Sequence, residues 1–401
     1  MWPTTPPRRR ERTTMTLAPD ELEEMAATTR RFIRERIHPI EQEVDDTDHI
    51  DPQVWQSLVD ESVELGLYTA NVPETLGGPG LTIAEQTRLW EEFGHTSWPF
   101  SYLLARPHRV LFACTEEQRS RYLDPVLAGK RAQCFALTEP GAGSDNSAMR
   151  TRAEKVEGGY VLNGAKHFIS HGNADFAIVF AVTGPPLRGR TPQVTAFLVD
   201  RGTPGFTVGK AQRMMGWSGM EECELVFENC FVPDDQVLGT PGEALRLGLA
   251  SVAQRRLQMA AYCVGAMERL LGLSIAYTRD RVVFDEPLFD KQGIRWMLAE
   301  AAMEPYLARE ATYKAARLCD EARAAGRSEI ELSRLFAREI SIAKLHATRA
   351  LNRVADVAVQ VHGGMGWCRE YPVERLYRDA RVFRIIEGAD EVHKEIIAKA
   401  L

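Results

Sequence analysis

The spacing of hydrophobic positions changes twice along the chain and divides it into three parts. From Asp20 to Leu127, apolar side chains recur every three or four residues, which is the period of an amphipathic helix. After Gln133 the period falls to two, as in strands that bury one face. Helical spacing returns at Thr240 and continues to the end of the chain. The pattern therefore predicts a helical domain, a β domain and a second helical domain.

The boundaries follow from these changes. The first sixteen residues contain prolines and a cluster of arginines but no apolar period, which predicts a disordered tail. With 401 residues and 44% hydrophobic content, the chain can bury large cores and is too long for one ordinary domain. We assign a tail at 1–16, a helical domain at 17–133, a β domain at 134–239 and a helical bundle at 240–401.

Cap and turn signals mark the helices. In the first domain the expected helix starts are Asp20 with Glu23, Asp51 with Pro52, and Thr82 with Glu85. In the last domain Thr240 and Pro241 predict the start of a long helix. The helices expected there cover about 240–279, 287–325 and 328–362, with a shorter one after Tyr371 and Pro372. Long helices with short connections predict an antiparallel four-helix-bundle-like domain.

Four segments of the middle domain are predicted to be strands, because they are rich in valine, phenylalanine and isoleucine and are separated by glycine and proline turns. They are residues 160–170, 176–182, 194–200 and 224–231. No helical pattern lies between them. An antiparallel barrel or sandwich is therefore expected, and not a doubly wound dinucleotide-binding fold.

Charge and composition argue against several classes of protein. The formal net charge is −7 and the pI is about 5.8, whereas binding to nucleic acids or anionic membranes needs a basic face. No run of about eighteen apolar residues predicts a membrane-spanning helix. The seven cysteines are scattered without a Cys-x-x-Cys pair, which argues against disulfides and a metal site. We expect a cytoplasmic protein without nucleic-acid or membrane partners.

One stretch, residues 134–145, joins an apolar strand directly to a polar, glycine-rich turn. Thr138 places a hydroxyl at the end of the strand, and Pro140 fixes φ. Gly141 and Gly143 lack Cβ atoms, so backbone N–H groups can approach a flat or anionic molecule closely. The stretch is therefore predicted to bind a ligand.

The string Leu-Thr-Glu-Pro-Gly-Ala-Gly-Ser-Asp at 137–145 resembles the flavin-binding signature of the acyl-CoA dehydrogenase family. Later segments match the family in the same order, and the resemblance covers nearly everything from about Pro19 to the end of the chain. It implies FAD as the cofactor and the architecture of α domain, β domain and α bundle. The residues that it places at the FAD here are Phe135, Leu137, Thr138, Gly143 and Ser144, of which Ser144 also touches the acyl-CoA.

Residues 163–170 resemble the family's second flavin strand. In the family an aromatic side chain packs against the isoalloxazine, and a hydroxyl two positions later bonds near its reactive N5. The resemblance assigns these places to Phe168 and Ser170, with Ile169 between them, although tryptophan and threonine are usual. Neighbouring polar residues are expected to be partly exposed or solvated and to have no catalytic role: His167, His171, Glu221, Glu222 and Glu224.

Six bundle residues resemble the family's contacts to the FAD of a neighbouring subunit. They are Arg281, Phe284, Gln292, Gln360, Gly363 and Gly364. A guanidinium at Arg281 suits a pyrophosphate, which it can grip with paired donors. The alternative for these segments is salt bridging at helix ends and a glycine helix cap. The resemblance implies that the FAD site is completed only in a homo-oligomer, a tetramer as in most relatives.

Residues 370–388 are similar to the family's catalytic region and place the base at Glu387. Removal of the weakly acidic α-hydrogen of a thioester needs such a positioned carboxylate. Some members carry the glutamate on the first bundle helix, just before the arginine that matches Arg256, but Arg255 stands there and cannot act as a base. The implied substrate contacts are Ser144, Arg256, Ile386 and Gly388.

The chain also departs from the family pattern. Ile386 replaces a frequent tyrosine, Ala389 and Asp390 replace Thr-Ser or Thr-Thr, and Ala253 replaces an aspartate that contacts pantetheine. These departures bear on the FAD phosphate contacts and on the acyl group, so a short straight-chain substrate is not assumed.

The resemblance predicts an FAD-dependent acyl-CoA dehydrogenase. Glu387 would take the α-proton, the β-hydrogen would leave as hydride to flavin N5, and the electrons would pass to an electron-transfer flavoprotein. An acyl-CoA oxidase and a dehydrogenase for acyl groups on a carrier protein are alternatives on the same fold. A non-catalytic DNA-binding relative is a third alternative, which the acidic charge balance disfavours.

Overall fold

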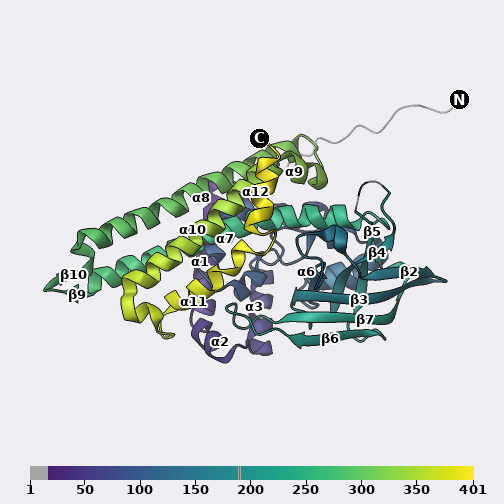
Figure 1. Cartoon of the computed structure of the whole chain (residues 1–401), viewed down its shortest axis with the longest axis horizontal. Coiled ribbons are helices and arrows are strands. Elements are labelled where there is room, and N and C mark those ends of the chain that lie inside the picture. Colours follow the sequence, from purple (N-terminus) through teal and green to yellow (C-terminus); the bar gives the residue numbers. More distant parts are fainter. Residues whose placement is uncertain (1–16, 188, 190) are drawn as a thin grey trace.

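The computed structural model describes residues 17–187, 189 and 191–401, so the predicted tail at 1–16 lies outside the described residues. Figure 1 shows the β domain at one end of the molecule and long helices that extend from it to the opposite end. The N-terminal helices lie beside the sheet and pack against the long helices. The predicted order of α domain, β domain and α bundle is confirmed.

The described part of the first domain is helical. Its α-helices are α1 (Pro19–Phe32), α2 (Glu41–Thr47), α3 (Pro52–Glu64), α4 (Ile83–Phe93), α5 (Glu116–Gln118) and α6 (Asp124–Leu127). Two predicted caps are confirmed. Asp51 accepts hydrogen bonds from the backbone N–H groups of Gln53 and Val54, while Thr82 and Glu85 each accept from the other's backbone N–H.

The prediction that the first helix starts at a capping box of Asp20 and Glu23 is wrong. Helix α1 begins at Pro19, and the carboxylate that accepts from the backbone N–H of Ala18 (2.9 Å) belongs to Glu21. At its other end the helix widens into a π-helical turn, η1 (Ile33–Ile37), before Pro39. Proline has no N–H to donate to a helical ladder, so α2 forms as a separate helix.

The described residues of the β domain form one eight-stranded sheet with the order β6-β7-β3-β2-β4-β5-β8, and β1 lies beside β4. The strands are β1 (Gln133–Ala136), β2 (Arg152–Val156), β3 (Gly159–Ser170), β4 (Phe176–Gly184), β5 (Gln193–Asp200), β6 (Phe206–Ala211), β7 (Glu222–Pro233) and β8 (Val237–Leu238). The four predicted strands are confirmed as β3, β4, β5 and β7. Strand β4 pairs in parallel with β1 and β2, so the sheet is mixed rather than wholly antiparallel.

Strand β4 is buried on both faces, which explains its continuous apolar run. Phe176, Ile178 and Phe180 pack into one cluster with residues of the N-terminal domain, whereas Ala177 and Val179 pack into a second cluster against β3 and β7. Alternate side chains of a strand point to opposite faces, so one strand supplies both clusters. The β domain is thereby fixed to the helices in front of it in sequence.

The bundle consists of α7 (Ala244–Asp280), α8 (Gln292–Ala324), α9 (Glu329–Leu335), α10 (Ala337–His362), α11 (Pro372–Ala380) and α12 (Asp390–Ala398). The predicted helix at 328–362 is two helices, because the backbone leaves helical geometry at Phe336. Helix α7 starts later than predicted. Before it, Gly242 adopts φ +81°, and its N–H donates to Thr195 Oγ1 (2.9 Å), so the chain turns there instead of starting the helix.

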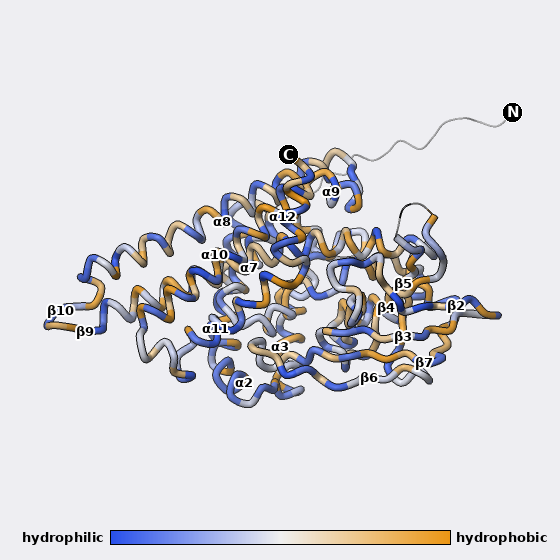
Figure 2. The backbone as a smooth tube through the Cα atoms, viewed as in Figure 1, coloured by the Kyte–Doolittle hydropathy of each residue, from blue (hydrophilic) through white to orange (hydrophobic). Residues whose placement is uncertain are grey.

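Helix α7 is the central helix of the bundle. Among the described residues it is the one helix long and apolar enough to cross a membrane, yet 61% of its most apolar window is buried inside the protein. It packs against α4, α8 and α10. Figure 2 shows apolar and polar residues alternating along α8 and α10, as expected for helices with one buried face.

Candidate active site

The glycine-rich turn after β1 is fixed to β3 by a buried ion pair. Lys166 Nζ donates to Glu139 Oε1 (2.7 Å) and to Leu137 O (3.1 Å). Glu139 also accepts from the backbone N–H groups of Arg150 (2.6 Å) and Thr151 (2.9 Å). Burial lowers the pKa of Lys166 to about 8, and the Glu139 carboxylate opposes that shift. The glutamate of the signature string therefore holds the turn in place.

Strand β3 carries a bulge at the predicted flavin-facing aromatic residue. The register between β3 and β7 shifts between Lys166 and Ile169, and Phe168 adopts a left-handed backbone with φ +54°. Bulges re-aim side chains at functional sites, and the Phe168 side chain is 53% exposed. The backbone N–H of His167 donates to Thr138 O (2.9 Å). The bulge and the turn therefore lie side by side.

Ser170 faces a buried carboxylate. Its Oγ donates to Glu222 Oε1 (2.6 Å), and Glu222 is 4% exposed. Burial raises the pKa of Glu222 to about 7. The expectation of a solvated face is wrong for Glu222, because β7 pairs with β3 at this point and Glu222 lies opposite Ser170. The expectation of a solvated side chain holds for Glu221, which is exposed.

The turn and the bulge leave an open surface that fits a flavin. A Cβ added at Gly141 or Gly143 would meet no atom within 4 Å, and Ser144 is exposed. Backbone N–H groups in such an open glycine turn can approach a ligand closely. The exposed Phe168 ring adds an aromatic face beside them.

The other residues predicted at the flavin are less accessible. Leu137 and Ile169 are buried in the two clusters of the β-domain core, so they can meet a ligand only through their backbones. Phe135 is half-buried and stacks on His108, with ring centroids 4.9 Å apart. These three side chains support the open surface from behind.

The predicted base, Glu387, lies in a short segment between η10 (Val382–Arg384) and α12. Glu387 has φ +52° and Gly388 has φ +98°. A left-handed backbone costs a non-glycine residue about 1–3 kcal/mol, and such strain clusters at functional sites. The Glu387 side chain is 23% exposed. It is therefore a partly accessible carboxylate held in a strained backbone.

Two cations hold this segment through its carbonyl groups. Arg256 Nε donates to Glu387 O (2.8 Å), and Lys344 Nζ donates to Gly388 O (2.8 Å). Burial lowers the pKa of Lys344 to about 8. A Cβ added at Gly388 would lie 3.1 Å from His393 Nε2 and 3.2 Å from Arg256 Nη2. Gly388 is therefore required both by its positive φ and by close packing.

Arg255 and Tyr102 connect Glu387 to the flavin strand. Arg255 Nε lies 4.0 Å from Glu387 Oε1, and its guanidinium carbon lies 5.9 Å from the centre of the Tyr102 ring. Tyr102 belongs to η3 (Trp98–Leu103). Its ring centroid lies 4.4 Å from that of His171, which directly follows Ser170 at the end of β3. Burial raises the pKa of Tyr102, and the charge of Arg255 opposes that rise. The contacts run from His171 at the end of β3 through Tyr102 and Arg255 to Glu387, so all three domains contribute to one site.

The predicted cross-subunit residues lie elsewhere. All six are exposed: Arg281, Phe284, Gln292, Gln360, Gly363 and Gly364. They lie near the ends of α7 and α10. These two helix ends are in contact, since Tyr277 stacks on His362 with ring centroids 4.4 Å apart. Figure 1 places the adjoining hairpin, β9 (Val282–Val283) with β10 (Glu286–Pro287), at the end of the molecule opposite the sheet. Within one chain these residues do not reach the turn at Thr138.

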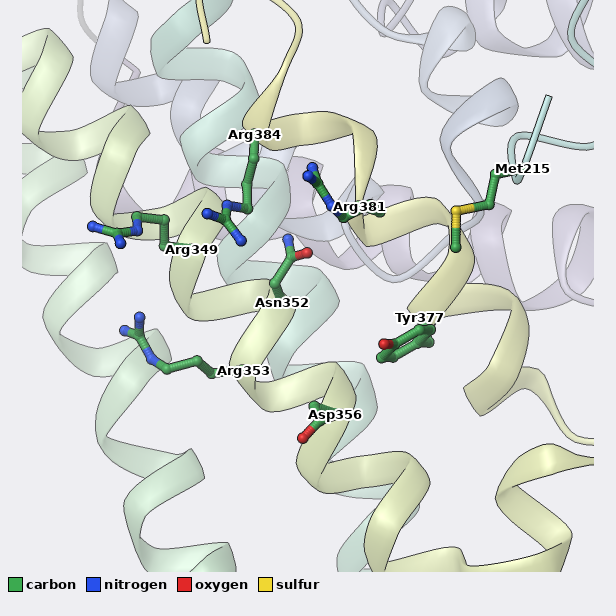
Figure 3. A pocket seen from close by; sticks show the side chains of 8 residues that line it. All are labelled: Met215, Arg349, Asn352, Arg353, Asp356, Tyr377, Arg381 and Arg384. Carbon is green, nitrogen blue, oxygen red and sulfur yellow. The ribbon is translucent and has the colours of Figure 1, made fainter. Parts of the chain in front are cut away.

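A cavity of about 520 Å³ lies between α10 and the segment formed by α11 and η10. It is lined by Met215, Arg349, Asn352, Arg353, Asp356, Tyr377, Arg381 and Arg384. Figure 3 shows Asn352 of α10 pointing toward the segment that carries Arg381 and Arg384, whereas Arg349 and Arg353 extend away from Tyr377. Arg349 and Arg384 also pair with Asp390 at the start of α12. None of the predicted flavin or substrate residues lines this cavity.

Two residues of the site, Tyr102 and Lys344, were not identified from the sequence. They lie in segments that carry no motif and reach the site only through the fold. Glu222 was named but expected to be solvated. Arg255 had a signal, since it stands directly before the arginine that matches the family. The sequence excluded it as a base, but its contact with Glu387 is visible only in the structure.

Three family models match the chain. They are described as acyl-CoA dehydrogenase, N-terminal domain (residues 19–130), middle domain (residues 134–230) and C-terminal domain (residues 245–401). An acyl-CoA dehydrogenase of Bacillus subtilis is 36% identical over 383 residues, which are 94% of this chain and 97% of the relative. The subunit CarC of a caffeyl-CoA reductase-Etf complex from Acetobacterium woodii is 34% identical over 352 residues, 86% of this chain and 89% of the relative. A structure of an acyl-CoA dehydrogenase complexed with FAD from Bacillus anthracis has a TM-score of 0.87 at 28% identity, with 96% of this chain and 68% of that chain covered.

The chain therefore belongs to the acyl-CoA dehydrogenase family, a class of FAD-dependent oxidoreductases. The predicted family, fold class, enzyme class and cofactor are confirmed.

Proposed function

We propose that this chain desaturates an acyl-CoA thioester between its α and β carbons, with Glu387 as the base that removes the α-proton. The observation that carries the proposal is the line of contacts from His171, at the end of the flavin strand, through Tyr102 and Arg255 to the Glu387 carboxylate. Desaturation needs a base beside the flavin, because a proton and a hydride leave from neighbouring carbons. When bound, FAD supplies the hydride acceptor.

The chain fixes this base through its backbone. Arg256 and Lys344 bind the carbonyl groups of Glu387 and Gly388, which sets the direction of the Glu387 carboxylate and of its backbone N–H. A backbone N–H aimed at the thioester carbonyl would stabilise the negative charge that develops there. Ile386 is half-buried and packs against the main core, which anchors the segment on its other side.

The remaining residue assignments follow the same geometry. Thr138, Gly143, Phe168 and Ser170 would hold the flavin, since the turn and the bulge present an open surface between them. Ser144 is exposed at the end of the turn and would contact the acyl-CoA. FAD would lie along the turn with its ring against Phe168.

A homo-oligomer, a tetramer as in most of the family, is part of the proposal. The six residues at the far end of the bundle are exposed and distant from the chain's own turn, so they would serve the FAD of a neighbouring subunit. Light scattering at low concentration should show an oligomer with full FAD content. A stable monomer with full FAD content would contradict this arrangement.

The electron acceptor proposed is an electron-transfer flavoprotein in the cytoplasm. One relative similar over most of the chain is a subunit of an Etf complex. An oxidase would instead reoxidise its reduced flavin rapidly with O₂. Stopped-flow mixing of substrate-reduced protein with O₂ and with an electron-transfer flavoprotein distinguishes the two acceptors. Acyl groups offered on CoA and on a carrier protein distinguish the two thioester carriers in the same assay.

The test of the base is Glu387→Gln. The variant should retain FAD and bind acyl-CoA but lower the rate of flavin bleaching under anaerobic conditions by roughly 10²–10⁴-fold, the usual contribution of a general base. The best substrate from a screen of acyl thioesters should be used for both proteins. Bleaching of the variant at a near wild-type rate would refute the assignment. Absence of bleaching with every thioester in the wild type would refute the proposed function.

A further inference from the structure

Arg255 places a positive charge beside Glu387 on the side that faces the N-terminal domain. Arg255 projects from α7, its guanidinium carbon 5.4 Å from the centre of the Trp90 ring and 5.6 Å from that of Trp98. Its Nη1 donates to Gln258 Oε1 (3.3 Å), a weak contact at the limit of a hydrogen bond. The carboxylate within 4.0 Å of Arg255 is that of Glu387.

Two guanidinium groups, those of Arg106 and Arg255, lie near the ring of Tyr102. The Arg106 guanidinium carbon is 4.4 Å from the centre of the Tyr102 ring, and Arg255 is 5.9 Å from it. Arg106 is 9% exposed, and its Nη2 donates to Gln133 O (2.7 Å). Among the described residues, no carboxylate lies within 4.0 Å of Arg106. A buried cation without an anionic partner is costly.

The titratable neighbours in the described part of the chain give Arg106 no paired carboxylate. Burial raises the pKa of Glu222 to about 7, and Glu222 accepts from Ser170. Burial lowers the pKa of His171 to about 3, and Arg106 adds to that shift. Burial also lowers the pKa of Arg106, and Arg255 adds to that shift. Around Tyr102 two guanidinium groups, those of Arg106 and Arg255, therefore face the carboxylate of Glu387 and the partly ionised carboxyl group of Glu222.

From this arrangement we propose that the acyl group of the substrate carries a carboxylate at its far end, bound by Arg255 and supported by the charge of Arg106. The inference rests on the proposed function, since it places the α-carbon at Glu387. An acyl chain whose α-carbon is at Glu387 extends toward Arg255 and Tyr102, because these side chains lie between the base and the end of the flavin strand at His171. The substrate class is an acyl thioester of a dicarboxylic acid.

The binding of a substrate carboxylate to Arg255 would also affect the proposed base, Glu387. Its guanidinium is 4.0 Å from Glu387 Oε1, farther than a good hydrogen bond. A substrate carboxylate offers Arg255 a paired, charge-assisted contact of the kind that guanidinium groups favour. The substrate therefore draws Arg255 away from Glu387 and leaves the base free to meet the α-proton. An acyl chain with a methyl end provides no such exchange.

The experiment compares thioesters that differ only at the far end. For chains of four, five and six carbons, CoA thioesters ending in carboxylate, amide and methyl are offered to the holoenzyme with a dye as electron acceptor. At one chain length or more, the carboxylate should exceed its amide and methyl partners by roughly 10- to 100-fold in kcat/KM, the usual range for hydrogen bonds to charged groups. Calorimetric binding of the same thioesters to Glu387→Gln should give the same ranking without turnover.

Variants then locate the preference. Arg255→Met should abolish it, mainly by raising KM for the carboxylate, whereas Arg255→Lys should keep part of it. Arg34→Met is the matched control, because Arg34 is 69% exposed and pairs with its neighbour Glu35. Flavin content and thermal unfolding are measured for each variant. If Arg255→Met does not fold, the comparison of wild type with Arg255→Lys carries the test.

Three results overturn the inference. Wild-type protein that uses methyl-ended chains as well as or better than carboxylate-ended chains at every length leaves the proposed function standing and removes this substrate class. A preference that survives in Arg255→Met removes Arg255 as its source. Absence of flavin bleaching with any thioester removes both the proposed function and this inference.

Discussion

The two halves of the site are held in different ways. The turn at Thr138 and the bulge at Phe168 belong to one domain and are fixed by backbone hydrogen bonds and by the buried pair of Lys166 and Glu139. The segment at Glu387 has no strand partner and is fixed by side chains of α7 and α10. The flavin half is thus part of a rigid sheet, while the catalytic half depends on a few long-range contacts.

Both halves nevertheless use the same local device. Phe168 and Glu387 are non-glycine residues with positive φ, at +54° and +52°. Each is the residue proposed to face the flavin or the substrate, and each is strained by about 1–3 kcal/mol unless its surroundings compensate. The sheet compensates at Phe168, and the bundle helices compensate at Glu387. Substitutions in the sheet that supports Phe168 should therefore change FAD binding, whereas substitutions in the bundle helices that support Glu387 should change catalysis.

The largest effect is expected from Lys166→Met. Removal of one partner of a buried ion pair leaves the Glu139 carboxylate without its cation, with only two backbone N–H donors, and should lower the free energy of unfolding by about 3–5 kcal/mol. The turn at Thr138 should loosen with it, so FAD content should fall. Chemical denaturation, with the flavin absorbance as a second signal, measures both changes.

The double variant Lys166→Met/Glu139→Gln is the control for this prediction. It removes the unpaired charge, so it should recover a large part of the stability lost in the single variant. Equal losses in the single and double variants would show that the charge pair is not what fixes the turn.

A smaller effect is expected from Glu222→Gln, and it depends on pH. Burial raises the pKa of Glu222 in the folded protein to about 7, above the ordinary value of 4.5. The folded state then binds more protons than the unfolded state between about pH 4.5 and 7, so stability is lost as pH rises through this window. Between pH 5 and 8 the wild type should lose on the order of 2–3 kcal/mol more than Glu222→Gln. Parallel stability curves for the two proteins would contradict the burial of an ionisable group there.

The same contrast explains what the sequence could predict. The three parts, the four main strands and the flavin-binding string follow from local periodicity and from residues adjacent in sequence. The strand β2 was missed because only Ala153 of its five residues is buried, which gives no apolar alternation. The helix start at Thr240 was wrong because Thr195 on another strand captures the N–H of Gly242.

The supports of the catalytic half lay beyond sequence patterns for a physical reason. Lys344 is 44 residues from the carbonyl group of Gly388 that it binds, and Arg256 is 131 residues from that of Glu387. Glu139 could be recognised as part of a string, but its partner Lys166 lies 27 residues away on another strand. Long-range pairs of single polar residues have no period, so only the fold reveals them.

The smallest effect, and the sharpest separation of the two halves, is expected from Lys344→Met. Gly388 O would lose its buried donor, which costs about 1–3 kcal/mol, and the segment can relieve that cost by moving. Glu387 would then be misplaced, and kcat with the best thioester should fall about tenfold, the equivalent of about 1.4 kcal/mol in the barrier. FAD content should remain at the wild-type level, the reverse of the pattern for Lys166→Met. Lys394→Met on α12 is the matched control, since Lys394 is about half exposed and pairs with Glu391. Loss of FAD from Lys344→Met to the extent seen with Lys166→Met would show that the two halves are not held independently.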